Sequence, residues 1–92
     1  MKRRGRALRR RYGHATVPRG YTSHTAPANS LQENVYRAGL LVGTANLKGP
    51  RHWVWWLAYI PEGEHAHPSG TVSTLDEAYA AIKRADRKGR RR

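Results

Sequence analysis

The chain has 92 residues, no cysteine and a formal net charge of +12. Its length allows one small domain, and the lack of cysteine excludes a disulfide framework and a thiolate metal site. The longest apolar run, Trp53 to Ile60, is far shorter than the roughly 20 residues of a membrane-spanning helix, so we expect no membrane partner.

The excess positive charge lies at the two ends of the chain. Residues 1–12 contain seven cations and no acid, and residues 83–92 contain seven cations and one acid. Residues 13–82 are close to neutral, with four cations and five carboxylates. Residues 1–30 have no sustained apolar period and are rich in Gly, Pro, Ser and Thr, so they cannot bury enough apolar surface to offset their ordering entropy. We therefore expect a basic, largely disordered arm over 1–30, a folded domain over 31–88 and a basic tail over 89–92.

Three strands are expected within the folded domain. The segment NVYRAGLLVGTANL predicts a first strand over 35–44, in which Gly39 and Gly43 mark a bulge or a close backbone approach. The segment RHWVWWLAYI, 51–60, predicts a central strand because both of its faces are apolar. After a turn at IPEGE, a third strand is expected over 69–73.

A C-terminal helix is the clearest element of the sequence. Thr74 and Glu77 have the spacing of a capping box, which predicts a helix that begins there. Four residues then form a narrow apolar stripe at helical spacing: Leu75, Ala78, Ile82 and Ala85. The expected fold is α+β, with a three-stranded antiparallel sheet packed against this helix.

The three tryptophans, Trp53, Trp55 and Trp56, all lie in the predicted central strand, and we assign them to the core or to an interface. One short helix covers one face of a sheet, so the other face needs another occupant. A second copy or a protein partner, the N-terminal arm, or stacked unpaired bases can fill that role. A shift of one residue in register would exchange the two faces, so the sequence leaves open which tryptophans point inward.

Three segments resemble DNA-binding domains of the plant AP2 type and the arm-binding modules of tyrosine integrases. They are YRAG, WVWWLAYI and GTVSTLDEAYAAIKRA, and the start MKRRGRALRRRYG is similar to small phage-encoded basic proteins. The resemblance implies the sheet-and-helix fold. This chain departs from the pattern of those domains on the sheet face that would read bases. It offers only Arg37 and Arg51 there, at or near the strand ends.

The sequence predicts a small non-enzymatic nucleic-acid-binding protein, with DNA or RNA as its partner. Arginine-rich segments bind phosphate chains by releasing counterions and through bidentate contacts. The expected contacts are Arg3, Arg4, Arg6, Arg9, Arg10 and Arg11, and then Arg84, Arg87, Lys88, Arg90, Arg91 and Arg92. The expected location is the cytoplasm of a bacterium or a phage-infected cell, or the virion.

An alternative is an interaction protein, or a virion or ribonucleoprotein assembly factor, that docks through an exposed aromatic sheet face. No catalytic residue and no cofactor is expected, because no nucleophile, paired carboxylates or phosphate-binding loop has a recognisable pattern. His65 and His67, with Glu64 and His52, have ligand types that suit zinc. Since a polar hairpin loop is far commoner than such a site, no metal is predicted.

Overall fold

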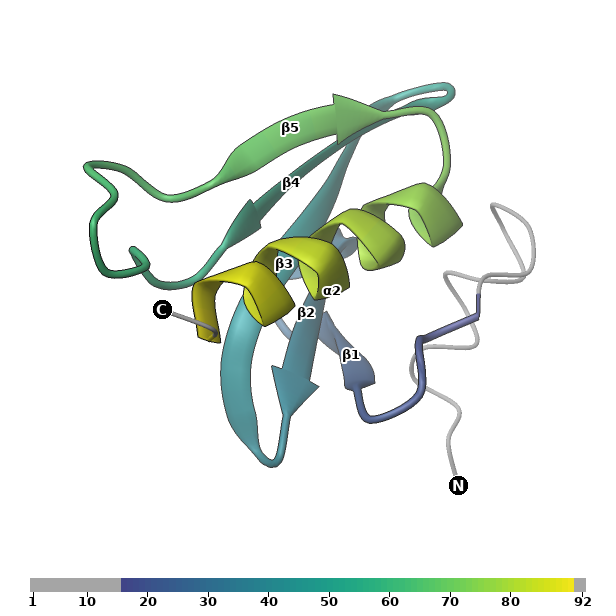
Figure 1. The fold of residues 1–92 in the computed structure, drawn as a ribbon. Helices are drawn as coiled ribbons and strands as arrows, with labels where there is room; N and C mark the ends of the chain where they lie inside the picture. Colours follow the sequence, from purple (N-terminus) through teal and green to yellow (C-terminus); the bar gives the residue numbers. More distant parts are fainter. Residues whose placement is uncertain (1–15, 91–92) are drawn as a thin grey trace.

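The computed structural model describes residues 16–90, which form a five-stranded antiparallel sheet with one helix lying across it (Figure 1). The elements are β1 (Thr22–Ala26), β2 (Asn29–Arg37), β3 (Leu40–Gly49), β4 (His52–Leu57), β5 (Ser69–Val72) and α2 (Leu75–Arg90). The strands lie in the sheet in the order of the sequence. The α+β class and the packing of the sheet on a C-terminal helix are confirmed, but the sheet has five strands, not three.

The predicted first strand, 35–44, is in fact the end of one strand and the start of the next. The chain reverses at Ala38 and Gly39, whose φ angles are +54° and +82°. Two successive residues with positive φ are the signature of the two-residue type I′ turn, whose twist suits a hairpin. The sequence concealed this turn because its first position holds alanine, where asparagine or aspartate is usual.

The strand β1 lies within the arm that was expected to be disordered. It pairs antiparallel with β2, with Ser23 opposite Val35 and Thr25 opposite Glu33. Just before β1, Val17 and Tyr21 pack against the hydrophobic core. A few isolated apolar residues are thus enough to order this segment, because the edge of β2 offers partners for its backbone hydrogen bonds. The expected boundary at residue 31 is therefore wrong, and the folded part includes residues 16–30; residues 1–15 lie outside the described part.

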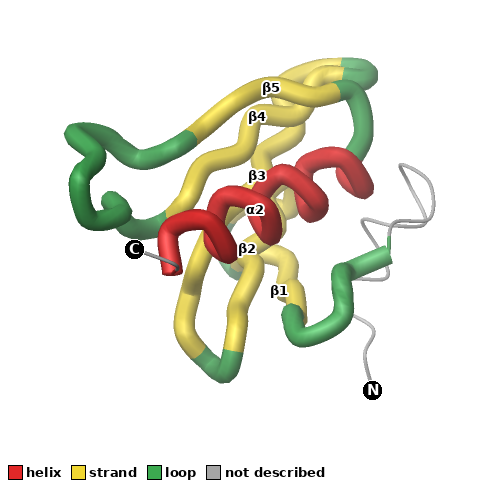
Figure 2. The backbone as a smooth tube through the Cα atoms, in the orientation of Figure 1, coloured by secondary structure: helices red, strands yellow, loops and turns green. Residues whose placement is uncertain are grey.

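The core lies between the sheet and α2, and Figure 2 shows that the helix crosses a single face of the sheet. The sheet register places Trp53 opposite Leu47 and Trp55 opposite Ala45, whose side chain is fully buried. Since side chains alternate along a strand, Trp56 points to the other face. The buried core consists of Val35, Val42, Ala45, Leu47, Trp53, Leu57, Leu75, Ala78, Tyr79 and Ile82.

The helix packs closely on the sheet at Gly43, one of the two glycines expected to mark a bulge or a close approach. A Cβ atom at this position would lie 2.6 Å from Cγ2 of Ile82. Only a residue without a side chain fits there, so Gly43 sets how near α2 can lie to β3.

The start of α2 is the predicted capping box. The Glu77 N–H donates to Oγ1 of Thr74, and the Thr74 N–H donates to Oε1 of Glu77, both at 3.1 Å. The helix continues to Arg90, so the first two residues of the expected tail, 89–92, are helical. Arg91 and Arg92 lie outside the described residues.

Candidate functional site

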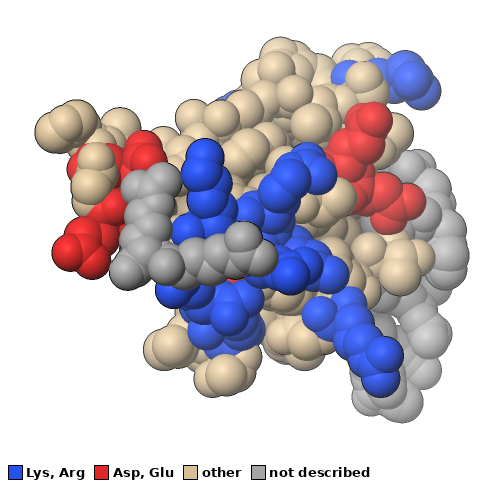
Figure 3. Space-filling view, in the orientation of Figure 1, with Lys and Arg blue, Asp and Glu red and all other residues tan. Residues whose placement is uncertain are grey.

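The outward face of α2 carries a set of cations, here called the basic face: Lys83, Arg84, Arg87 and Lys88. Their spacing places them on adjacent turns of one side of the helix. The sheet-facing side holds the apolar stripe, so these side chains are directed away from the core. Figure 3 shows Lys and Arg side chains gathered over the helix, with Asp and Glu side chains at its flanks.

The one carboxylate within this stretch, Asp86, does not neutralise the basic face. Its side chain is fully buried on the sheet-facing side of the helix, whereas the four cations point toward solvent. The pairs Lys83 with Arg87 and Arg84 with Lys88 are four residues apart, and like charges at this spacing destabilise a helix by about 0.2–0.5 kcal/mol per pair. Arg87 and Lys88 lie in the last turn of α2, where the helix dipole favours cations and offsets part of this repulsion.

The basic face also borders a hollow on the surface. Pro18 and Ala80 line it together with all four cations, and its volume is about 750 Å³. Pro18 belongs to the segment that leads into β1, so the hollow lies between that segment and the outer side of α2. An elongated anion can therefore contact several of the four cations at once.

A buried hydrogen-bond cluster lies beneath the C-terminal half of α2, and Asp86 is at its centre. Tyr59 and Tyr21 donate their hydroxyl groups to the Asp86 carboxylate at 2.6 and 2.7 Å. Arg37 donates from Nε at 2.7 Å and from Nη2 at 3.2 Å. Arg90 donates from Nε at 3.3 Å. The cluster joins the segment before β1, the end of β2, the loop after β4 and the helix.

These contacts shift the acid–base properties of the cluster. Burial alone raises the pKa of Asp86, but hydrogen bonds from Arg37, Tyr59 and Tyr21 outweigh it and lower the pKa to about 2. Burial, followed by the hydrogen bond to Asp86, raises the pKa of Tyr59 to about 12 and also raises the pKa of Tyr21. The carboxylate therefore stays charged and the two phenols stay protonated over the physiological range.

A second buried carboxylate, Glu33, ties β1 to β2 and the helix. Thr25 donates its hydroxyl to Oε2 of Glu33 at 2.7 Å, and Tyr79 donates its hydroxyl to Oε1 at 3.3 Å. The burial of these two acids was not predicted from the sequence. For Asp86 a signal was present, because it lies four residues after Ile82 and so continues the apolar stripe.

The predicted contact residues fall into three groups. Arg84, Arg87 and Lys88 lie together on the basic face, which Lys83 extends. Arg90 instead turns toward Asp86, with its side chain 46% exposed. The others lie outside the described residues: Arg3, Arg4, Arg6, Arg9, Arg10, Arg11, Arg91 and Arg92.

The sheet face away from the helix, here called the open face, is polar and contains one of the three tryptophans, Trp56. The side chains of Gln32 and Asn34 are hydrogen-bonded at 3.0 Å, and Thr44 donates to Asn34 at 3.3 Å. Of the three tryptophans assigned to the core or to an interface, Trp53 lies in the core and is 3% exposed. The ordered part of the expected arm extends the sheet at its edge rather than lying on this face.

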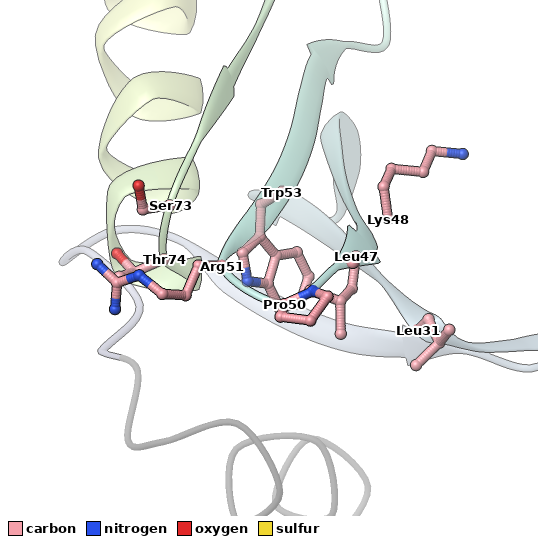
Figure 4. A pocket seen from close by; sticks show the side chains of 9 residues that line it. Leu31, Leu47, Lys48, Pro50, Arg51, Trp53, Ser73 and Thr74 are labelled. Atoms are coloured by element: carbon pink, nitrogen blue, oxygen red, sulfur yellow. The ribbon is translucent and has the colours of Figure 1, made fainter.

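A second hollow, of about 520 Å³, lies at the opposite end of α2 from Asp86 (Figure 4). The side chains of Trp53, Leu47 and Leu31 give it an apolar lining, and Arg51 lies near its rim, whereas Lys48 extends away from it. Among residues 16–90 no group of three His, Cys, Asp or Glu side chains could hold a metal ion.

Comparisons of the chain with protein-family models, curated proteins and solved structures found no match. The resemblance to AP2-type and integrase domains thus stays a prediction. Within the described residues, no helix is long and apolar enough to cross a bilayer.

Proposed function

We propose that this chain is a small, non-enzymatic nucleic-acid-binding protein whose basic face contacts the phosphate backbone. The observation that carries the proposal is the separation of charge on α2. Four cations face outward around one hollow, while the carboxylate of the same stretch is buried. A repeated anion such as a phosphate chain fits a row of cations on successive helical turns.

Residues 1–12 and the last two residues add further cations to the chain. Contacts of this kind are electrostatic and largely independent of base sequence. We propose that the protein acts in a bacterial or phage-infected cell, or in a virion, where DNA or RNA is the abundant polyanion.

A salt titration of the full chain with labelled double-stranded DNA and single-stranded RNA tests the proposal. The variant Arg84→Gln/Lys88→Gln removes two cations from the basic face. The control Lys48→Gln/Arg51→Gln removes one lysine and one arginine from the other end of the molecule, so both proteins have the same net charge. The log–log salt slope should fall by about 0.7–0.9 per lost phosphate contact in the first variant and stay nearly unchanged in the second.

Two outcomes would overturn the proposal. One is no binding of the full chain to either nucleic acid at low salt. The other is an equal loss of affinity in the two double variants, which would mean that only net charge matters. The nucleic acid that binds more tightly identifies the natural class of partner.

A second candidate function is self-association through the open face. The paired strand residues on this face, among them Asn34, Thr44 and Trp56, are uncharged. In a chain with a net charge of +12, two copies meet with least repulsion at an uncharged face. Sedimentation equilibrium should then give a dimer that Trp56→Lys dissociates. A monomer at all concentrations up to the solubility limit would refute it.

A further inference from the structure

Arg37 and Arg90 converge on the same buried carboxylate from two different elements. Arg37 ends β2 and binds both oxygens of Asp86, and Arg90 lies in the last turn of α2 and binds Oδ2. Two guanidinium groups therefore share one carboxylate. One full positive charge at this place is left without an acidic partner in the cluster.

Both arginines keep donors for another ligand. Arg37 uses its Nε and Nη2 edge for Asp86, which leaves the Nη1 hydrogens and one Nη2 hydrogen. Arg90 uses Nε for Asp86, and its Nη2 lies 3.5 Å from the hydroxyl oxygen of Tyr21. The two side chains are 27% and 46% exposed, so solvent reaches both while Asp86 beneath them is fully buried.

We infer that Arg37 and Arg90 form a phosphate-binding site, with Asp86 as the residue that positions them. This inference rests on the proposed function, because the phosphate is a phosphodiester of the bound nucleic acid. A guanidinium that is fixed on one edge presents its other donors without first losing side-chain freedom, and paired N–H groups match phosphate oxygens. The adjacent basic face supplies the neighbouring phosphate contacts.

The site differs from the basic face in its geometry. Most cations of the basic face are exposed and lose side-chain freedom when they bind a phosphate. Here Asp86 binds both arginines and Tyr21 lies within 3.5 Å of Nη2 of Arg90, while Tyr59 holds the Asp86 carboxylate in place. The site should therefore require the shape of arginine as well as its charge.

The test follows the arginine side chains directly, by NMR of their Nε–H and Nη–H groups in the full chain. A single-stranded oligonucleotide or a short DNA duplex is titrated in, with inorganic phosphate in a parallel titration. The side-chain signals of Arg37 and Arg90 should shift and saturate together with the backbone signals of the basic face. Inorganic phosphate should shift the same signals at much higher concentration.

Affinity measurements provide the second readout. Arg37→Lys keeps the charge and should weaken oligonucleotide binding about fivefold, as expected for the loss of one bidentate contact. Arg90→Gln should weaken it by a similar factor, and Arg19→Gln, at an exposed position before β1, by less than twofold. The thermal unfolding midpoint of each variant shows whether an effect arises from folding.

The outcomes separate this inference from the proposed function. If the full chain binds and the basic face shifts, but the Arg37 and Arg90 side-chain signals do not, the pair is purely structural and the inference fails alone. If Arg37→Lys binds like the wild type, the inference also fails. If the full chain binds no nucleic acid, the proposed function fails and the inference with it.

Discussion

Arg37 and Asp86 are 49 residues apart in the sequence, yet the Arg37 guanidinium spans both oxygens of the Asp86 carboxylate, at 2.7 and 3.2 Å. This bidentate pair fixes the end of β2 to the C-terminal half of α2. The carboxylate is fully buried, so its charge depends on these partners for the solvation that it has lost.

Replacing Asp86 with asparagine should therefore destabilise the fold. Asp86→Asn keeps the shape but removes the charge that two arginines and two tyrosines face, and breaking a buried ion pair costs about 3–5 kcal/mol. We expect the free energy of unfolding in urea to fall by about 3 kcal/mol. The control Asp76→Asn, at an exposed helix start, should cost less than about 1 kcal/mol. Equal losses in the two variants would show that burial of the charge is unimportant.

The same carboxylate predicts how stability changes with acid. The folded state lowers the pKa of Asp86 from 3.8 to about 2, so the folded protein binds this proton less readily than the unfolded chain does. The contribution, about 2 kcal/mol, is therefore fully present above pH ~4 and is lost as the pH falls through ~2. Between these values the stability of the wild type should decrease more than that of Asp86→Asn. Parallel curves would contradict the lowered pKa.

The sequence predicted those parts of the fold that depend on local pattern. The capping box of Thr74 and Glu77 and the apolar stripe of α2 follow from spacing alone. The two apolar faces of the tryptophan strand predicted an interior strand, and β4 does pair on both sides, although β3 is the middle strand of the sheet. The strand β1 and the hairpin at Ala38 and Gly39 do not follow from local pattern, because the first is stabilised by an existing sheet edge and the second uses an unusual turn residue.

The sequence likewise predicted only the part of the candidate site that depends on local pattern. Arg84, Arg87 and Lys88 follow from composition and helical spacing, which place them on one face. The pairing of Arg37 with Arg90 needs the end of β2 to reach the end of α2, and no local pattern encodes that contact. In the sequence Asp86 is only the one acid among the cations of residues 83–92, whereas tertiary packing buries it and leaves the outer surface more positive.

The turn at Ala38 offers a stabilising substitution. Alanine at a φ of +54° occupies the left-handed region, which costs an L-residue about 1–2 kcal/mol, and asparagine tolerates that region better. Ala38→Asn should raise the free energy of unfolding by about 0.5–1 kcal/mol. The matched control is Ala28→Asn, in the turn between β1 and β2, where φ is not positive; it should change stability little. A stability gain at Ala28 and none at Ala38 would refute the turn assignment.

The contact between Gly43 and Ile82 gives the sharpest test of how the helix lies on the sheet. A methyl group added at Gly43 would meet Cγ2 of Ile82 at 2.6 Å and the backbone oxygen of Trp56 at 3.1 Å, so either α2 or β3 must move. We expect Gly43→Ala to lower the free energy of unfolding by about 1–3 kcal/mol, the usual cost of overpacking. Gly49→Ala lies in the same strand, where an added Cβ has no atom within 4 Å, and should be nearly neutral. The second substitution Ile82→Ala, which removes both Cγ atoms that the added methyl group would meet, should recover part of the loss in the Gly43→Ala background although it is destabilising alone. If the two effects simply add, the helix does not meet the sheet at this pair.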